Sequence, residues 1–106
     1  MAFAISSALL DALVLSIVSK EDTYGYKITQ EIREAVDVSE STLYPVLRRL
    51  QKNDYMTTYD KEYAGRNRRY YRITSSGEQL LKQYLSDWLE YKNGINQILF
   101  GGEGNE

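Results

Sequence analysis

The chain has 106 residues, of which 42% are hydrophobic, and this size and composition predict a single domain with one core. It contains no cysteine and no histidine, which excludes disulfides, zinc sites built on thiolate or imidazole, and catalytic triads that depend on imidazole. We therefore expect no metal, no cofactor and no catalytic residues. The net charge is −2, but residues 41–73 carry eight cationic side chains against three acidic ones, a distribution typical of a polyanion-binding surface.

The first predicted element is an apolar helix at about residues 7–19. The apolar run at residues 8–18 is too short to span a membrane and contains Asp11, and no Lys or Arg precedes Lys20 as a secretion signal would require. We therefore expect a cytoplasmic protein that has no membrane partner. Because this helix is apolar on nearly every side, it must be covered from several directions, which suggests a partner subunit.

Two shorter helices are expected next. Asp22 and Thr23 are good N-cap residues, and apolar residues then recur at helical spacing to about residue 35. After a short turn, either Ser39 or Ser41 can cap a third helix that ends near residue 52. Its buried side is predicted to consist of Leu43, Val46, Leu47 and Leu50.

A β-hairpin follows the third helix. Residues 53–54 can supply the left-handed residue that ends this helix. Residues 55–59 and 69–73 are β-prone, and the polar segment between them contains Gly65. We expect two short strands joined by a mobile tip at residues 60–68.

A long helix completes the predicted fold. Residues 74–76 can cap a helix at residues 75–100, and the glycine-rich residues 101–106 are expected to form a flexible tail. The fold class is therefore α+β, mainly α. We predict a winged helix-turn-helix DNA-binding domain at residues 1–74 with an appended C-terminal dimerisation helix at 75–100.

The exposed face of the third helix is the first candidate site. If the apolar residues point inward, helical geometry turns hydroxyls and cations outward, where they can donate to base edges and neutralise phosphates. An ordinary solvated helix face is the alternative. The hairpin tip adds three arginines within residues 66–69, which have little reason to cluster without a polyanionic partner. The predicted DNA-binding residues are Ser41, Thr42, Tyr44, Arg48, Arg49, Lys52, Arg66 and Arg68.

Three segments resemble the hallmark motifs of the PadR family of transcriptional regulators. They are DTYGYKI at residues 22–28, STLYPVLRRL at 41–50 and GRNRRYYRIT at 65–74. The resemblance covers about residues 8–92 and departs from the family at Asp54, where a glycine usually ends the recognition helix. It implies DNA contacts from Ser41, Thr42, Tyr44, Arg48, Arg66 and Arg68. It also implies a compact subfamily in which a single C-terminal helix forms the dimer.

The long helix carries a second candidate site. Its apolar stripe is predicted to pair with the first helix and with its counterpart in a second subunit through Leu81, Leu85, Trp88, Leu89, Ile95 and Leu99. In compact PadR-like regulators a tryptophan at the like position stacks on planar aromatic drugs at the dimer axis. Here Ala8, Asp11 and Ala12 could form the walls of such a cavity, and the carboxylate would favour a cation. The alternative is a plain interface tryptophan.

These observations predict a homodimeric, sequence-specific transcriptional regulator that binds double-stranded DNA. We expect repression by occupancy of an operator, relieved by a small planar aromatic or cationic effector. The alternative is a winged-helix module that binds a protein without direct DNA contact. An enzyme is the least favoured hypothesis, because no pair of carboxylates has a recognisable catalytic context.

Overall fold

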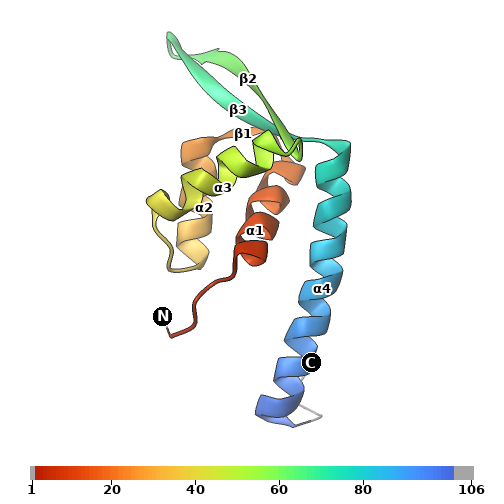
Figure 1. The fold of residues 1–106 in the computed structure, drawn as a ribbon. Coiled ribbons are helices and arrows are strands. Elements are labelled where there is room, and N and C mark those ends of the chain that lie inside the picture. Colours follow the sequence, from red (N-terminus) through yellow and green to blue (C-terminus); the bar gives the residue numbers. More distant parts are fainter. Residues whose placement is uncertain (1, 102–106) are drawn as a thin grey trace.

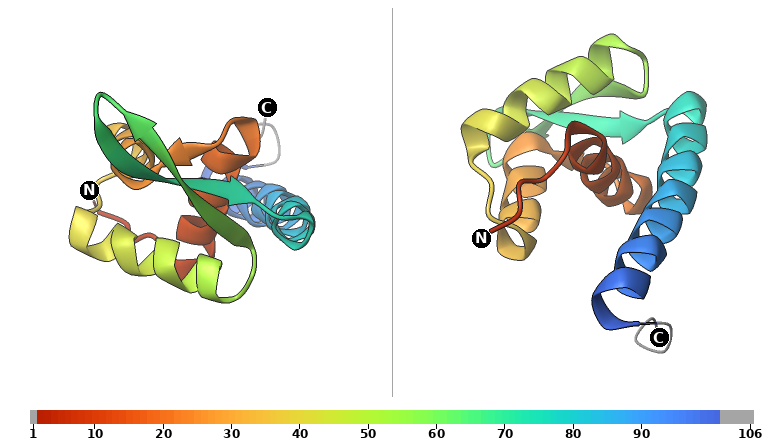
Figure 2. Two further views of the ribbon diagram at one scale, coloured as in Figure 1. Left: turned by 90° about the horizontal axis from the view of Figure 1, so that it is seen from above. Right: turned by 60° about the horizontal axis from the view of Figure 1, so that its bottom comes forward.

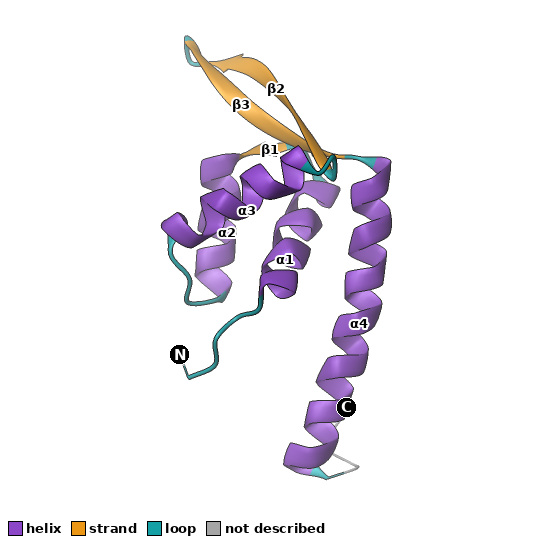
Figure 3. Cartoon of the chain, in the orientation of Figure 1, coloured by secondary structure: helices purple, strands orange, loops and turns teal. Residues whose placement is uncertain are grey.

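The computed structural model describes residues 2–101 of the chain. Three helices pack beneath a small antiparallel sheet, and a fourth, longer helix runs down beside them (Figures 1 and 3). In chain order the elements are α1 (Ser7–Lys20), β1 (Thr23–Tyr24), α2 (Gly25–Ala35), α3 (Glu40–Lys52), β2 (Met56–Tyr63), β3 (Arg66–Ile73) and α4 (Ser75–Phe100). This arrangement confirms the predicted fold class of a mainly helical winged helix-turn-helix.

The core lies where α1, α2 and α3 meet under the base of the sheet. All four apolar positions predicted for α3 are buried, because successive apolar residues at helical spacing share one side of the helix. The core also includes Val14, Leu15, Val18, Ile28, Ile32 and Met56. From α4, Leu81 joins this core, since the first half of α4 packs against α1.

The sheet has the strand order β1-β3-β2. Strand β1 was not predicted: Thr23 pairs with Tyr71 and Tyr24 with Tyr70, whereas Asp22 and Thr23 had been expected to cap α2. The N-cap of α2 is Tyr24, whose side chain makes no capping hydrogen bond. The cap prediction was wrong because pairing to β3 holds this segment extended for one residue longer.

The hairpin of β2 and β3, which we call the wing, is longer and more regular than predicted. The strands pair from Met56 opposite Ile73 to Tyr63 opposite Arg66, so most of the supposed mobile tip at residues 60–68 is strand. Only Ala64 and Gly65 form the turn, with φ angles of 54° and 78° that suit a two-residue hairpin loop. The outer wing is polar on both sides, so no hydrophobic alternation marked these residues as strand.

The boundaries of α3 and α4, unlike the start of α2, agree with the predicted caps and turn. Ser39 is the N-cap of α3 and accepts from the backbone N–H of Thr42, which decides between the two serines that the sequence allowed. Thr74 caps α4. Asp54 has a φ of 66°, so it is the left-handed residue that follows α3. The predicted tail at 101–106 lies outside the described residues except for Gly101.

Helix α4 gives the molecule its elongated shape. Its second half extends past the three-helix body, away from the wing (Figures 1 and 2), and the longest dimension is 55 Å. None of the helices within residues 2–101 combines the length and apolar character that a membrane crossing requires.

Candidate nucleic-acid interface

Helix α3 presents a polar face opposite its buried leucines. Ser41, Thr42, Arg48 and Lys52 are exposed, and Tyr44 is partly buried. The Ser39 hydroxyl lies 2.9 Å from that of Ser41 and 3.0 Å from that of Thr42, so three hydroxyls cluster at the start of the helix. Ser39 was not among the predicted contacts, although its role as the N-cap places it beside them.

One hollow on the surface is lined by residues of both α3 and the wing. Its volume is about 590 Å³, and Tyr44 from α3 and Arg68 and Arg69 from β3 line it together with Tyr24, Gly25, Tyr26 and Tyr71. Seen from above, the wing lies across the helices with α3 beside it (Figure 2, left). Elements far apart in sequence therefore share one face that carries arginines, tyrosines and hydroxyls.

Arg68 is held by stacking, whereas the sequence placed it in a mobile tip. Its guanidinium lies over two rings, 4.0 Å from the ring centroid of Tyr24 and 4.3 Å from that of Tyr63. Arg66, beside the turn, is exposed. Arg68 thus joins the outer wing to β1, the strand that leads directly into α2, and such stacking stabilises the pairing of these strands.

The base of the wing is tied to the loop after α1. The Tyr59 hydroxyl donates to Asp22 at 2.8 Å, and Arg72 Nε donates to the same carboxylate oxygen at 3.0 Å. The hydrogen bond to Asp22 raises the pKa of Tyr59, and it raises the pKa of Arg72. Asp22, expected to cap a helix, instead anchors the wing.

Arg49 is exposed, but its guanidinium is paired with the buried carboxylate of Asp11. Its Nη2 lies 2.6 Å from Asp11 Oδ1 and its Nη1 lies 3.2 Å from Asp11 Oδ2, a bidentate ion pair between α3 and α1. The hydrogen bond to Asp11 raises the pKa of Arg49. This arrangement differs from two predictions, because Arg49 was placed among the DNA contacts and Asp11 was offered to a cationic ligand.

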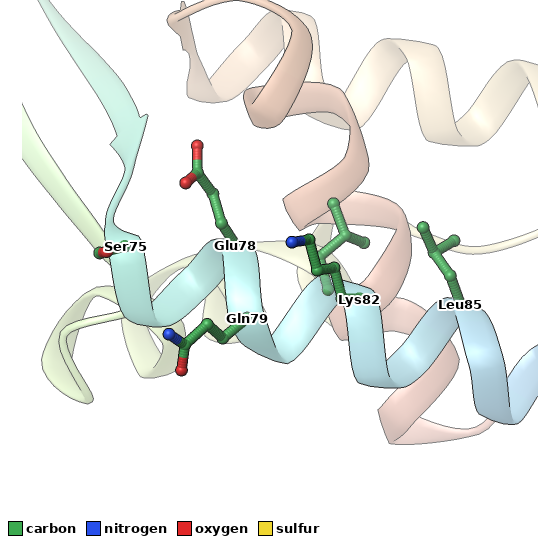
Figure 4. Close-up of a pocket in the computed structure, with 6 residues that line it drawn as sticks. Ser75, Glu78, Gln79, Lys82 and Leu85 are labelled. Atoms are coloured by element: carbon green, nitrogen blue, oxygen red, sulfur yellow. The ribbon is translucent and has the colours of Figure 1, made fainter.

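The remaining predicted ligand residues differ in their exposure in the single chain. Ala8 is exposed and Ala12 is buried, while Trp88 is 39% exposed and has the Tyr91 ring at a centroid distance of 6.1 Å. A hollow beside α4 lies nearer its start (Figure 4) and is lined by Ser75, Glu78, Gln79, Leu81, Lys82 and Leu85. The cavity expected around Trp88 stays a prediction that depends on a second subunit. Within residues 2–101, no three acidic side chains gather closely enough to hold a metal ion.

The apolar stripe of α4 is largely uncovered. Leu81 is the exception, because it is only 8% exposed and packs in the core of its own chain, so little of it is accessible to a partner. The other predicted interface residues are 39% to 66% exposed, namely Leu85, Trp88, Leu89, Ile95 and Leu99. Further apolar side chains exposed on the same helix are Tyr91, Ile98 and Phe100.

A three-helix body with a β-hairpin beside the exposed face of its third helix defines the winged helix-turn-helix class. The chain belongs to the PadR-like family of transcriptional regulators, whose model matches residues 14–83. This finding confirms the family that the three sequence motifs predicted.

Similar proteins cover most of the chain. The structure of smu.1704 from Streptococcus mutans UA159 is 44% identical, has a TM-score of 0.89 and covers 96% of both chains. An uncharacterized protein from Lysinibacillus sphaericus is 36% identical over 99 residues, which are 89% of this chain and 91% of that protein. Bacillus subtilis PadR, solved in complex with operator DNA, is 26% identical with a TM-score of 0.65 and matches over 73% of this chain and 45% of its own.

Proposed function

We propose that this protein is a homodimeric repressor that binds operator DNA through α3 and the wing. The observation that carries the proposal is the hollow in which Tyr44, from the polar face of α3, lies on one surface with Arg68 and Arg69 of the wing. A segment with an excess of cations on an acidic chain suits a polyanion, whose phosphates it neutralises. The operator complex of the relative from Bacillus subtilis supports this assignment.

Helix α3 would enter the major groove. Ser41, Thr42 and Tyr44 offer hydroxyls to base edges, and Arg48 can donate two hydrogen bonds to a guanine. Lys52 beyond them, together with Arg66 and Arg68 of the wing, would neutralise phosphates. Arg49 is left out of this set because its guanidinium is bound to Asp11.

The second subunit would dock on α4. In this proposal residues 1–74 form the DNA-binding domain and residues 75–100 the dimerisation helix. The exposed stripe around Leu85, Leu89 and Leu99 supports the assignment, since an apolar helix face of this length is stabilised by another helix. A twofold axis through α4 would present two recognition helices to half-sites about 34 to 36 Å apart.

An effector would bind near the same axis. Trp88 is partly exposed on α4 and Ala8 is exposed on α1, and the small side chains of Ala8 and Ala12 would leave room for a flat ring between two subunits. We therefore favour a planar aromatic effector. The structure lends no support to a cationic preference, because the charge of Asp11 is already balanced by Arg49.

Binding of DNA from the protein's own promoter, followed by fluorescence anisotropy over a range of salt, tests the proposal. A dimer that neutralises about eight phosphates gives a slope of log affinity against log salt of about −7. Arg66→Ala removes one cation from each subunit and should reduce that slope by about 2. Lys82→Ala on α4 is the control for lost charge and should leave the slope unchanged. An unchanged slope for Arg66→Ala would remove Arg66 from the proposed phosphate contacts, and a wild type with no salt-dependent DNA binding would favour the alternative, a winged-helix module that binds a protein.

A further inference from the structure

One buried carboxylate joins three helices. Asp11 of α1 is only 5% exposed, and both of its oxygens accept hydrogen bonds from the Arg49 guanidinium of α3. The Tyr84 hydroxyl of α4 donates to Asp11 Oδ2 at 3.1 Å. Among the hydrogen bonds and ion pairs of residues 2–101, no other side chain joins α1, α3 and α4.

The burial of this carboxylate makes its partners interdependent. A buried charged group depends on the protein for its hydrogen bonds, so the loss of Arg49 would leave the Asp11 charge unpaired and the loss of the Tyr84 hydroxyl would leave Oδ2 with one donor fewer. Asp11 therefore stabilises the arrangement in which Arg49 and Tyr84 are both in place. A shift of α4 by less than 1 Å would stretch the contact from Tyr84 beyond hydrogen-bond distance.

Arg49 connects this cluster to the proposed DNA contacts. It lies in the last turn of α3, directly after Arg48, which faces outward. Neighbouring residues on a helix point in directions about 100° apart, so holding the side chain of Arg49 also sets the rotation of Arg48 and Tyr44 about the helix axis.

Tyr84 connects the cluster to the face of α4 that a partner or a ligand would touch. Leu85 follows it directly, and Trp88 lies one helical turn further on. A change in how α4 is covered at these residues would act on the segment that donates to Asp11. The burial of the Tyr84 ring raises its pKa, and the nearby charge of Asp11 adds to this effect, so the hydroxyl stays protonated as the donor that the cluster requires.

We propose that Asp11 is a positioning residue that couples the position of α4 against α1 to the orientation of the recognition helix α3. The proposal rests on the proposed function, since it describes how the dimer and ligand face is linked to the DNA face. Coupling of this kind is reciprocal: if α4 biases α3, then DNA bound to α3 must change the surroundings of α4. Trp88, the single tryptophan of the chain, reports on α4 and lies in a segment that extends away from the wing (Figure 1).

The test compares the full-length wild type with Tyr84→Phe, which removes only the hydroxyl. DNA binding is measured by anisotropy of labelled promoter DNA, and coupling by the shift in Trp88 emission at saturating unlabelled DNA. We expect the wild type to show a shift. Tyr84→Phe should lose most of that shift while its DNA affinity falls by no more than about fivefold. Tyr91→Phe is the control, since it changes a ring neighbour of Trp88 that has no contact with Asp11, and it should keep the full shift.

A second measurement keeps the coupling testable without DNA. In hydrogen exchange of the free protein, the amides in the last turn of α3 should exchange faster in Tyr84→Phe than in the wild type or in Tyr91→Phe. Equal exchange in all three proteins would overturn the proposal, as would a full Trp88 shift in DNA-bound Tyr84→Phe. A wild type that binds no DNA would instead refute the proposed function, and the exchange comparison would still decide the coupling.

Discussion

Gly77 lies at the tightest contact between α4 and the base of the wing. A Cβ atom built on this residue would be 2.2 Å from the carbonyl oxygen of Tyr55 and 2.7 Å from Cγ1 of Ile73. The same carbonyl accepts from the backbone N–H of Thr74 at 3.1 Å, so it cannot move away without weakening that bond. We therefore predict that Gly77→Ala strains the junction that orients α4.

The change in the free energy of unfolding that we expect for Gly77→Ala follows from two opposing effects. Alanine favours a helix over glycine by at most about 1 kcal/mol. A clash with backbone that must shift by more than about 1 Å costs roughly 1 to 3 kcal/mol, as overpacking of a core does. Because the contact is with backbone, we place the clash near the upper end and expect Gly77→Ala to lower the free energy of unfolding by about 2 kcal/mol.

Gly94 provides the matched control on the same helix. A Cβ atom there has nothing within 4 Å, and by helical geometry Gly94 points away from the apolar stripe. Gly94→Ala should therefore raise the free energy of unfolding by up to about 1 kcal/mol. Urea denaturation of all three proteins at one protein concentration measures both effects, since dimer formation makes stability depend on concentration. A Gly77→Ala protein as stable as the wild type would refute the close approach of Tyr55.

Three further predictions concern the wing, the dimer and the partly buried Tyr84. Arg68→Lys keeps the charge but loses the planar stack on two rings, so it should lower the free energy of unfolding by about 0.5 to 1 kcal/mol in urea, whereas Arg66→Lys should have no effect. Leu89→Lys places a charge on the exposed stripe of α4 and should give monomers in sedimentation analysis with an unchanged helical circular dichroism spectrum; a dimer would argue against the proposed interface. Folding raises the pKa of Tyr84, so the protonated tyrosine contributes its full stability below the ordinary tyrosine value of 10.0. Above that pH the unfolded chain loses the proton first, and the contribution is lost as the pH rises through the folded-state pKa. Between about pH 9 and pH 11, Tyr84→Phe should therefore lose less stability than the wild type, and parallel losses would count against this assignment.

The helices could be predicted because their burial follows a simple period. Leu43, Val46, Leu47 and Leu50 recur at helical spacing, and all are buried in α3. The polar face of α3 follows from the same geometry, which is why Ser41, Thr42 and Arg48 could be assigned to the surface. Turn chemistry was also informative, since Asp54 adopts the left-handed conformation expected at the end of the helix.

The contacts of Arg49 could not be predicted from helical spacing. Arg48 and Arg49 are adjacent and identical in type, and the spacing alone placed Arg49 on the border of the exposed face. Its direction depends on Asp11, which lies 38 residues earlier and is buried on α1. A lone carboxylate in an apolar helix was the available signal, because a buried charge requires a partner.

Strand β1 is a second feature that could not be predicted from the sequence. Two residues are too few to display an alternating pattern, and Thr23 and Tyr24 form a strand only because Tyr71 and Tyr70 of β3 lie opposite them. The stacking of Arg68 between Tyr24 and Tyr63 depends on that pairing. Sequence motifs placed Arg68 in the wing, but its immediate neighbours depend on how distant segments pair.

The junction at Thr74 limits how this architecture can vary. A single residue separates β3 from α4, and Thr74 both caps the helix and donates through its hydroxyl to the Asp54 carbonyl at 2.7 Å. One inserted residue would rotate every later side chain of the helix by about 100° and advance it by about 1.5 Å. The hydrophobic seam would then face a different direction, so insertions and deletions should be tolerated at the hairpin turn or beyond residue 100 but not at this joint.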